Sequence, residues 1–254
     1  MELAIIIPTK NEEDTLPYLI SSIKEQSIKD FKIIVADANS KDKTRKIAKR
    51  YKCELVNGGT PSQGRNRGAE KALSYNTSIL VFIDSDMLFP SKEFLEISTK
   101  EFKKRNLDIA ATFQMPFDTE IKLDLKDIIQ TSKETKDWRY RLFYNLSNNL
   151  LKISQKKKKP FAQPCIFIKK EAYEKIGGFD ERIEFGEDSK YIQYAVKKGC
   201  KFGILNEPGK ILISPRRFDK NGFWKMLGVY IYLNTLILFG HEFKVNGKIK
   251  YNRR

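Results

Sequence analysis

The first eighty residues alternate continuous apolar runs with amphipathic stretches. The runs at 3–8 (LAIIIP), 31–36 (FKIIVA), 53–57 and 79–83 (ILVFI) predict strands; the run at 3–8 is typical of a strand buried on both faces, and the run at 79–83 of another buried strand. Residues 13–26 and 63–75 predict helices, and Ser40 with Asp42 predicts the start of a third helix that continues to Tyr51. Strands and helices that alternate with short connections are typical of a parallel sheet covered by helices on both faces.

The second half of the chain is less regular. Its predicted helices are 92–105, 121–153 and 187–198, and its predicted strands are 108–113, 161–168, 202–205 and 210–213. A polar break at 131–136 makes 121–153 one or two amphipathic helices, and Gly177-Gly178 predicts a turn. Residues 223–240 are strongly apolar. The fold class we expect is α/β, with a mostly parallel sheet covered by helices and a C-terminal apolar helix.

Length and composition narrow the class of protein. With 254 residues, 41% hydrophobic and 31% charged, the chain is neither disordered nor a polytopic membrane protein, and we expect one domain with a C-terminal appendage. The three cysteines are far apart and lack the spacing of zinc ligands, so they are predicted to be reduced, mostly buried thiols of a cytoplasmic protein. The apolar run at 3–7 is too short for a signal peptide.

The chain is strongly basic, with a formal net charge of +16. Such a surface suits nucleic acid, anionic lipid headgroups or phosphorylated substrates, and charge alone does not choose among them. The basic excess lies late in the chain, at Lys156–Lys159, at Arg216, Arg217, Lys220 and Lys225, and in the tail from Lys244 to Arg254. We interpret Lys156–Lys159 as a solvated loop.

Polar residues follow the predicted strands where parallel sheets bind ligands. Asp84-Ser85-Asp86 comes directly after ILVFI, and two carboxylates at this spacing can hold Mg²⁺ or Mn²⁺, which would neutralise a diphosphate. The alternative is a turn in which Asp and Ser make local hydrogen bonds. Asp37 follows the second strand and could accept a hydrogen bond from a base or ribose, or act only as a turn residue.

Three further candidates lie elsewhere in the chain. Arg65, near the start of a predicted helix, could hold an anion. The pair Glu187-Asp188 begins another predicted helix, where it either supplies a general base or simply complements the helix dipole. His241 is the only histidine, which disfavours a Ser-His-Asp hydrolase.

Taken in order, these segments resemble the inverting family-2 glycosyltransferases with the GT-A fold. IIIPTKNEEDTLPYLISSI is similar to the opening strand, loop and helix of that family, and VADANSKDKT to its Asp-x-x-Ser-x-Asp-x-Thr element. GRNRGAEKA is similar to its Arg-Asn-x-Gly element, FIDSD to its metal motif, and AYEKIGGFDE with FGEDSKY to its acceptor-side signature. The resemblance covers roughly residues 3–215, and five elements in family order are specific where each alone is weak.

The resemblance implies roles for individual residues. Pro8, Thr9 and Glu12 line the nucleotide pocket, Asp37 contacts the base, Arg65 lies beside the diphosphate and Asp84 lies on the ribose side. Asp86 is the main ligand of Mn²⁺ or Mg²⁺, with Asp84 as a second acidic residue, and Asp188 is the catalytic base beside Glu187. Many relatives carry a metal-binding His after the last strand, where this chain has Ile213-Ser214-Pro215-Arg216-Arg217. Arg216 or Arg217 could hold the diphosphate instead.

The implied reaction is one displacement at the anomeric carbon of a nucleotide-diphospho-sugar, with inversion. We expect a catalytic domain at 1–215, divided into a nucleotide-sugar half (1–115) and an acceptor half (116–215), and an appendage at 216–254. There are three rival hypotheses. A nucleotidyltransferase is disfavoured because no glycine-rich loop follows the first strand. The other two are a nucleotide-binding protein of this fold without transferase activity and a basic nucleic-acid-binding protein, for which no binding module is evident.

The appendage predicts contact with an anionic membrane surface on the cytoplasmic side. Residues 223–240 are flanked by basic residues and contain Trp224, Tyr230 and Tyr232, which suit a membrane interface. The apolar run is shorter than the ~20 residues of a typical span, so a surface helix, a short span and a core helix all remain open. A lipid-linked or cell-surface glycan acceptor would fit such an anchor.

Overall fold

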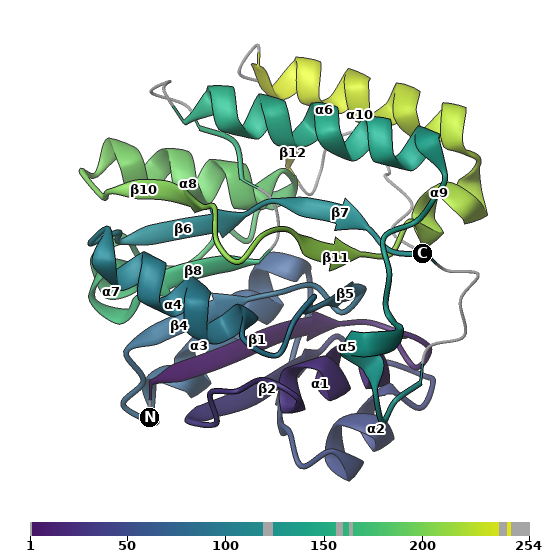
Figure 1. Ribbon diagram of the computed structural model, residues 1–254. Helices are drawn as coiled ribbons and strands as arrows, with labels where there is room; N and C mark the ends of the chain where they lie inside the picture. The colour runs from purple at the N-terminus through teal and green to yellow at the C-terminus, as the bar shows by residue number, and fades with distance from the viewer. Residues whose placement is uncertain (1, 119–123, 156–159, 163–164, 239–242, 245–254) are drawn as a thin grey trace.

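A seven-stranded, mostly parallel sheet forms the centre of the protein in this computed structural model, which describes residues 2–118, 124–155, 160–162, 165–238 and 243–244 (Figure 1). The strands run in the order β10-β6-β8-β4-β1-β2-β3. Their bounds are β1 Leu3–Thr9, β2 Phe31–Asp37, β3 Glu54–Asn57, β4 Ile79–Phe82, β6 Ile109–Thr112, β8 Ile166–Lys169 and β10 Phe202–Leu205. Only β8 runs antiparallel to its neighbours in this sheet, which confirms the expected α/β class.

Helices cover both faces of the sheet because the central strands are apolar on both sides. On one face lie α1 (Leu16–Lys24), α2 (Thr44–Arg50) and α4 (Phe94–Lys104); on the other lie α3 (Pro61–Leu73), α7 (Lys170–Ile176) and α8 (Glu187–Lys197). Within β1, Leu3, Ile5 and Ile7 belong to the first core, whereas Ala4 and Ile6 belong to the second. Successive side chains of a strand point to opposite faces of the sheet, so one apolar run contributes to both cores.

A second layer of structure lies beyond this sheet. The short strands β5 (Met87–Leu88), β11 (Ile211–Ile213) and β7 (Gln114–Pro116) form a small sheet, and β9 (Ile183–Phe185) pairs with β12 (Phe243–Lys244). Helices α6 (Trp138–Ser154), α9 (Arg216–Asn221) and α10 (Phe223–Leu238) lie together above it (Figure 1), and α5 (Ile128–Thr131) lies near α1. Tyr140, Tyr144, Phe218, Phe223 and Met226 form an aromatic cluster of their own between α6, α9 and α10.

Two glycines let α3 approach the sheet closely. A Cβ on Gly68 would lie 2.4 Å from Ile6 Cγ2, and one on Gly64 would lie 3.0 Å from Pro8 Cβ. The helix begins with a capping box in which Thr60 accepts from the Gln63 amide and Gln63 accepts from the Thr60 amide. This packing fixes the position of Arg65, which lies between the two glycines.

The sequence located most elements, with some corrections. All four early strands and the break before α6 are confirmed, but Ser40 does not cap a helix: α2 begins at Thr44, and Ser40 instead donates to Asp37 and accepts from the Asn11 amide. Strand β8 begins only at Ile166, and α7, α9, β5, β7 and β9 were not predicted. The apolar stretch 223–240 contains α10. Residues 239 and 240 lie outside the described residues, and so do Lys156–Lys159 and His241.

The remaining expectations concern the cysteines and the membrane. Cys53, Cys165 and Cys200 are free thiols, two of them buried, and burial raises the pKa of Cys165 to about 12. Across the part of the chain that the structure describes, no helix combines the length and the apolar character needed to cross a bilayer.

Candidate active site

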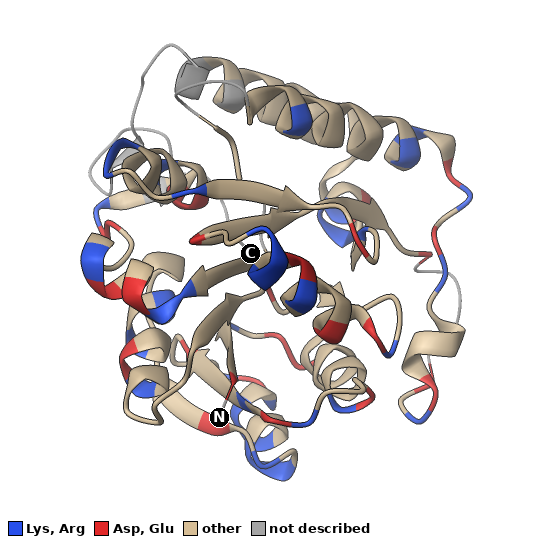
Figure 2. Cartoon of the chain, turned by 60° about the vertical axis from the view of Figure 1, so that its left-hand side comes forward, with Lys and Arg blue, Asp and Glu red and all other residues tan. Residues whose placement is uncertain are grey.

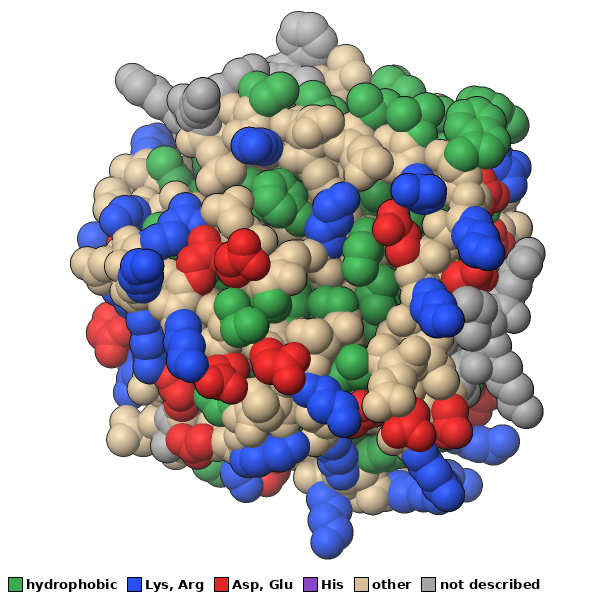
Figure 3. Space-filling model, in the orientation of Figure 1, with side chains coloured by type: hydrophobic (Ala, Val, Ile, Leu, Met, Phe, Trp, Pro, Cys, Tyr) green, Lys and Arg blue, Asp and Glu red, His purple; other side chains and the backbone are tan. Residues whose placement is uncertain are grey.

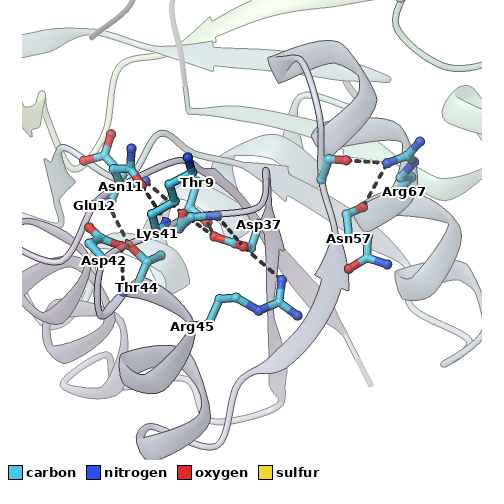
Figure 4. A network of polar contacts seen from close by, with 12 residues as sticks. Thr9, Asn11, Glu12, Asp37, Lys41, Asp42, Thr44, Arg45, Asn57 and Arg67 are labelled. Carbon is cyan, nitrogen blue, oxygen red and sulfur yellow. Dashed lines mark hydrogen bonds and ion pairs between the residues drawn. The ribbon is translucent and has the colours of Figure 1, made fainter.

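The carboxyl ends of β1 and β2 form a dense polar network (Figure 4). Asp37 lies at its centre and is 1% exposed. Its carboxylate accepts from Arg45 Nη1 at 2.9 Å, from the Ser40 amide at 3.0 Å and from Thr9 Oγ1 at 3.4 Å. The ion pair and these hydrogen bonds compensate the burial of the Asp37 carboxylate and hold it in a fixed orientation.

A hollow of about 360 Å³ opens beside Asp37. This volume falls in the range of small-molecule sites, about 300–1,000 Å³. Its wall is made of Asp37, Ala38, Asn39, Arg45, Asn57, Gly58 and Gly59. Gly58 is required there because a Cβ would lie 2.6 Å from the carbonyl oxygen of Ala36. The sequence pointed to Asp37 at this edge but not to Arg45, whose contact with Asp37 depends on how α2 is placed.

The loop after β4 places Asp86 beneath the start of α9. Asp86 is 4% exposed, and its carbonyl accepts from the Ser214 amide at 2.9 Å. Its Oδ2 lies 3.5 Å from Arg217 Nη2 and 3.8 Å from Arg216 Nη2, while Oδ1 is buried without a hydrogen-bond partner among the described residues. Arg216 also donates to Glu12 Oε2 at 2.6 Å, so the N-terminal loop, the Asp-Ser-Asp turn and α9 meet at one place.

Opposing effects of its surroundings set the pKa of Glu12. Burial raises the pKa of its carboxyl group, whereas the Arg216 guanidinium and the Thr15 hydroxyl lower it, and the net effect is a raised pKa. Thr9 is buried one residue beyond Pro8, at the end of β1. The residues assigned to the nucleotide pocket therefore lie along one edge of the sheet.

Arg65 joins the turn after β4 to the start of α8. Its side chain is 3% exposed, and its guanidinium lies 3.0 Å from Asp84, 3.0 Å from Glu187 and 3.3 Å from Asp188. Burial opposes the charge of Arg65, but Asp188, Asp84 and Glu187 together raise its pKa above the usual range. The structure thus brings together two acidic groups that are separated by about a hundred positions in the sequence.

Asn66, next in the chain, fixes the turn before α8. Its Nδ2 donates to the Phe179 carbonyl at 2.9 Å, and its Oδ1 accepts from the Phe179 amide at 2.7 Å. A Cβ on Gly178 would lie 2.5 Å from Asn66 Oδ1, so this glycine is needed for the contact. Helix α3 therefore positions both sides of the acidic cluster. In the sequence Asn66 stands only as part of the segment GRNRGAEKA, and its contact with Phe179 was not predicted.

The described residues do not by themselves supply a full set of ligands for a divalent cation at this site. Among the described residues, no group of three or more His, Cys, Asp or Glu side chains is arranged to hold a metal ion. Asp84 faces Arg65, whereas Asp86 has a buried oxygen available for a cation. Mg²⁺ is often held by one or two carboxylates together with phosphate oxygens of the substrate, and Asp86 fits that pattern.

The fold and this edge of the sheet define a GT-A type protein, and comparison with known proteins gives its family. The model of glycosyl transferase family 2 matches residues 4–177. The chain belongs to this family. This is the family that the sequence resemblance predicted.

Similar proteins agree with this assignment. The 4,4'-diaponeurosporenoate glycosyltransferase of Staphylococcus haemolyticus is 31% identical over 109 residues, which cover 41% of this chain and 29% of that enzyme. The chain thus aligns with less than a third of the length of this relative. Two solved structures have the same fold. The crystal structure of S. aureus TarS 1–349 with UDP-GlcNAc aligns with a TM-score of 0.62 and 18% identity, over 84% of this chain and 58% of that one. The structure of the mannosyltransferase PcManGT from Pyrobaculum calidifontis with GDP-Man and Mn²⁺ aligns with a TM-score of 0.60 and 20% identity, over 84% of this chain and 56% of that one.

Proposed function

We propose that this chain transfers a sugar from a nucleotide-diphospho-sugar to an acceptor hydroxyl, with inversion at the anomeric carbon. The observation that carries the proposal is the meeting of three groups at one sheet edge. A hollow beside Asp37, a buried carboxylate at Asp86 with two arginines above it, and the acidic pair Glu187-Asp188 lie around the ends of β1, β2 and β4. In this proposal the hollow takes the nucleoside of the donor, Asp86 and the arginines take the diphosphate that leaves, and the acidic pair supplies the base.

The donor half is residues 1–115. The nucleoside lies in the hollow beside Asp37, next to Pro8 and Thr9, with its ribose toward Asp84. The diphosphate lies between Asp86 and α9, where Arg216 and Arg217 supply positive charge close to Glu12. Solved structures of this fold that contain UDP-GlcNAc or GDP-Man support a nucleotide-sugar donor.

Asp86 is the residue that would hold Mn²⁺ or Mg²⁺. Its buried Oδ1 is the available oxygen, Asp84 is near in sequence but faces Arg65, and the similar fold of PcManGT holds Mn²⁺ together with GDP-Man. When bound, such an ion stabilises the negative charge that develops on the departing nucleoside diphosphate. Arg216 and Arg217 lie on the same side and would add to this stabilisation.

Asp188 is the proposed general base, and 116–215 is the acceptor half. Asp188 and Glu187 both contact Arg65, which also contacts Asp84 and so holds the three side chains close together. Asp188 accepts the proton of the acceptor hydroxyl as that oxygen attacks the anomeric carbon from the side opposite the diphosphate. Glu187 orients the loop or the acceptor. This arrangement gives inversion in one step.

The acceptor is a glycan or another hydroxyl compound, and we favour one that is linked to lipid. The appendage 216–254 is basic, and α10 within it is apolar and carries Trp224 and Tyr232 on its exposed side. A chain that lies at an anionic membrane surface on the cytoplasmic side would meet a lipid-linked acceptor directly. Nucleic acid is not among the proposed partners.

The proposed donor site predicts stabilisation of the protein by a nucleoside diphosphate together with Mn²⁺. A thermal-shift screen of nucleoside diphosphates should find one that raises the melting temperature more with Mn²⁺ than without it, because ligands that bind only the native state stabilise it. Asp86→Ala should abolish the Mn²⁺-dependent part of the shift. Asp14→Ala, which removes an exposed aspartate nearby, is the matched control and should behave as the wild type. An unchanged Mn²⁺-dependent shift in Asp86→Ala would remove Asp86 from the site.

A further inference from the structure

Exposed apolar side chains are concentrated on two adjacent helices. Of the ten large apolar side chains that are exposed in the described part of the chain, eight lie on α6 and α10. They are Trp138, Leu142, Leu146, Leu150 and Ile153 on α6, and Trp224, Ile231 and Tyr232 on α10. Figure 3 shows hydrophobic side chains along the upper edge of the molecule, over these helices. We call these eight residues the α6–α10 face.

The geometry of α6 shows that this exposure is not a by-product of core packing. The buried side chains of α6 are Tyr140, Tyr144, Asn148, Leu151 and Ser154. The two tyrosines pack in the aromatic cluster with α9 and α10, and Asn148 exchanges two hydrogen bonds with the backbone of Gln114 in β7. The exposed stripe begins two residues earlier and, like the buried one, repeats every three or four residues. Two residues correspond to about 200° of rotation, so the stripe lies on the side of the helix opposite the core. Each of the five large apolar residues there keeps more than half of its surface exposed.

Helix α10 continues this face. Phe143 and Tyr230 lie in ring contact at 5.6 Å between centroids, and Tyr140 donates to Asp219 at the start of the C-terminal helices. The two helices are therefore packed side by side. Both tryptophans of the chain lie on the face, Trp138 at 64% and Trp224 at 67% exposure, and tryptophan is the side chain that favours the interface between lipid and water.

Basic residues predominate around the α6–α10 face. Helices α6, α9 and α10 carry seven basic residues (Arg139, Arg141, Lys152, Arg216, Arg217, Lys220, Lys225) and one acidic residue, Asp219. In Figure 2 the helices at the top of the molecule show basic positions and no acidic ones along their length. Arg139 and Arg141 pair with Asp137 and Glu134 in the preceding linker, whereas Lys152, Lys220 and Lys225 point to solvent. A second copy of the chain placed on this face would meet the same excess of positive charge.

We propose that the α6–α10 face docks on the surface of an anionic lipid bilayer. Apolar side chains with two tryptophans and a basic surround are the features of helices that lie in the membrane interface. This proposal rests on the proposed function, which already includes a membrane contact through α10. It adds α6 to that contact and places both helices along the membrane surface. Helix α10 leads directly from α9, whose arginines lie over Asp86, so docking would bring the diphosphate end of the active site close to the lipid headgroups.

Vesicle binding by the full-length chain tests this face, with its two tryptophans as the probe. Vesicles of phosphatidylcholine with one quarter phosphatidylglycerol should bind the protein, shift its tryptophan emission to shorter wavelength and release it as salt is raised. Pure phosphatidylcholine should bind it much more weakly. Leu146→Gln together with Leu150→Gln should weaken binding roughly tenfold or more, since each leucine buries apolar area in the interface. Leu125→Gln with Tyr194→Gln, which replaces the two large exposed apolar residues that the described part of the chain has outside the face, should bind as the wild type does.

Several outcomes would overturn the proposal. One is a wild-type protein that stays in solution with anionic vesicles; another is a Leu146/Leu150 variant that binds like the wild type while keeping the wild-type melting temperature. A lipid-independent dimer that the same variant dissociates would assign the face to a second copy instead. The nucleoside diphosphate shift with Mn²⁺ is measured on the same samples. A retained shift without vesicle binding would remove only the membrane face, and vesicle binding without the shift would remove only the donor site.

Discussion

Replacing Asp188 by asparagine should lower the rate of sugar transfer by roughly 10²–10⁴-fold, the usual effect of removing a general base. Asparagine keeps the size of the side chain but cannot accept a proton at neutral pH. The affinity for the nucleoside diphosphate should hardly change, because the lost interaction forms in the transition state. The measurement is the turnover of variant and wild type with a working acceptor, together with the Kd of the nucleoside diphosphate.

Glu187→Gln is the control for this prediction. Both carboxylates contact Arg65, so either substitution disturbs the same buried ion pair, and only the base should affect turnover strongly. We expect a milder loss for Glu187→Gln. The reverse ranking would exchange the roles of the two residues. A near-normal rate for Asp188→Asn would remove Asp188 from the mechanism, and loss of donor binding together with activity would give it a structural role.

Arg65→Met should lower the free energy of unfolding by about 3–5 kcal/mol, the typical cost of breaking a buried ion pair by removing one partner. Methionine fills part of the volume but leaves Asp84, Glu187 and Asp188 facing one another without the cation that now lies among them. The side chain of Arg65 is 3% exposed, so water cannot take the place of its charge. Urea denaturation of variant and wild type gives the difference in free energy.

Arg182→Met is the matched control for Arg65→Met. Arg182 also pairs with a carboxylate, Asp180 at 2.8 Å, but its side chain is 77% exposed. Pairs at the surface contribute about 0–1 kcal/mol, so this variant should be nearly as stable as the wild type. Equal stability of the two variants would mean that the three carboxylates do not depend on Arg65, and that Arg65 does not hold the acidic cluster in place.

Local patterns in the sequence were enough to locate most of the fold and the residues at the strand ends. Strand β1 is visible as LAIIIP because both faces of it are buried, and Asp37 and Asp84 are visible because they follow such runs. The same reasoning placed a helix start at Ser40, which was wrong because the Ser40 hydroxyl is used by Asp37 and the Asn11 amide. A tertiary contact thus replaced the local one that the pattern indicated.

Contacts between distant parts of the chain could not be predicted in the same way. Arg65 meets Glu187 across 122 positions, and Arg216 meets Glu12 across 204. No periodicity relates residues so far apart; their approach depends on the packing of Gly64 and Gly68 against β1 and on the return of β11 beside β5. The outer stripe of α6 is likewise visible as apolar in the sequence, but which side faces the core is known only once β7 is placed.

The central claim is that the edge of the sheet around Asp37 and Asp86 binds a nucleotide-sugar donor. A crystal structure of the wild-type chain, grown with Mn²⁺ and the nucleoside diphosphate that stabilises it most, tests this directly. We expect the base in the hollow lined by Asp37 and Gly58, and the diphosphate with its Mn²⁺ between Asp86 and the two arginines of α9. A nucleotide bound at any other place on the protein, or Mn²⁺ held away from Asp86, would contradict the account.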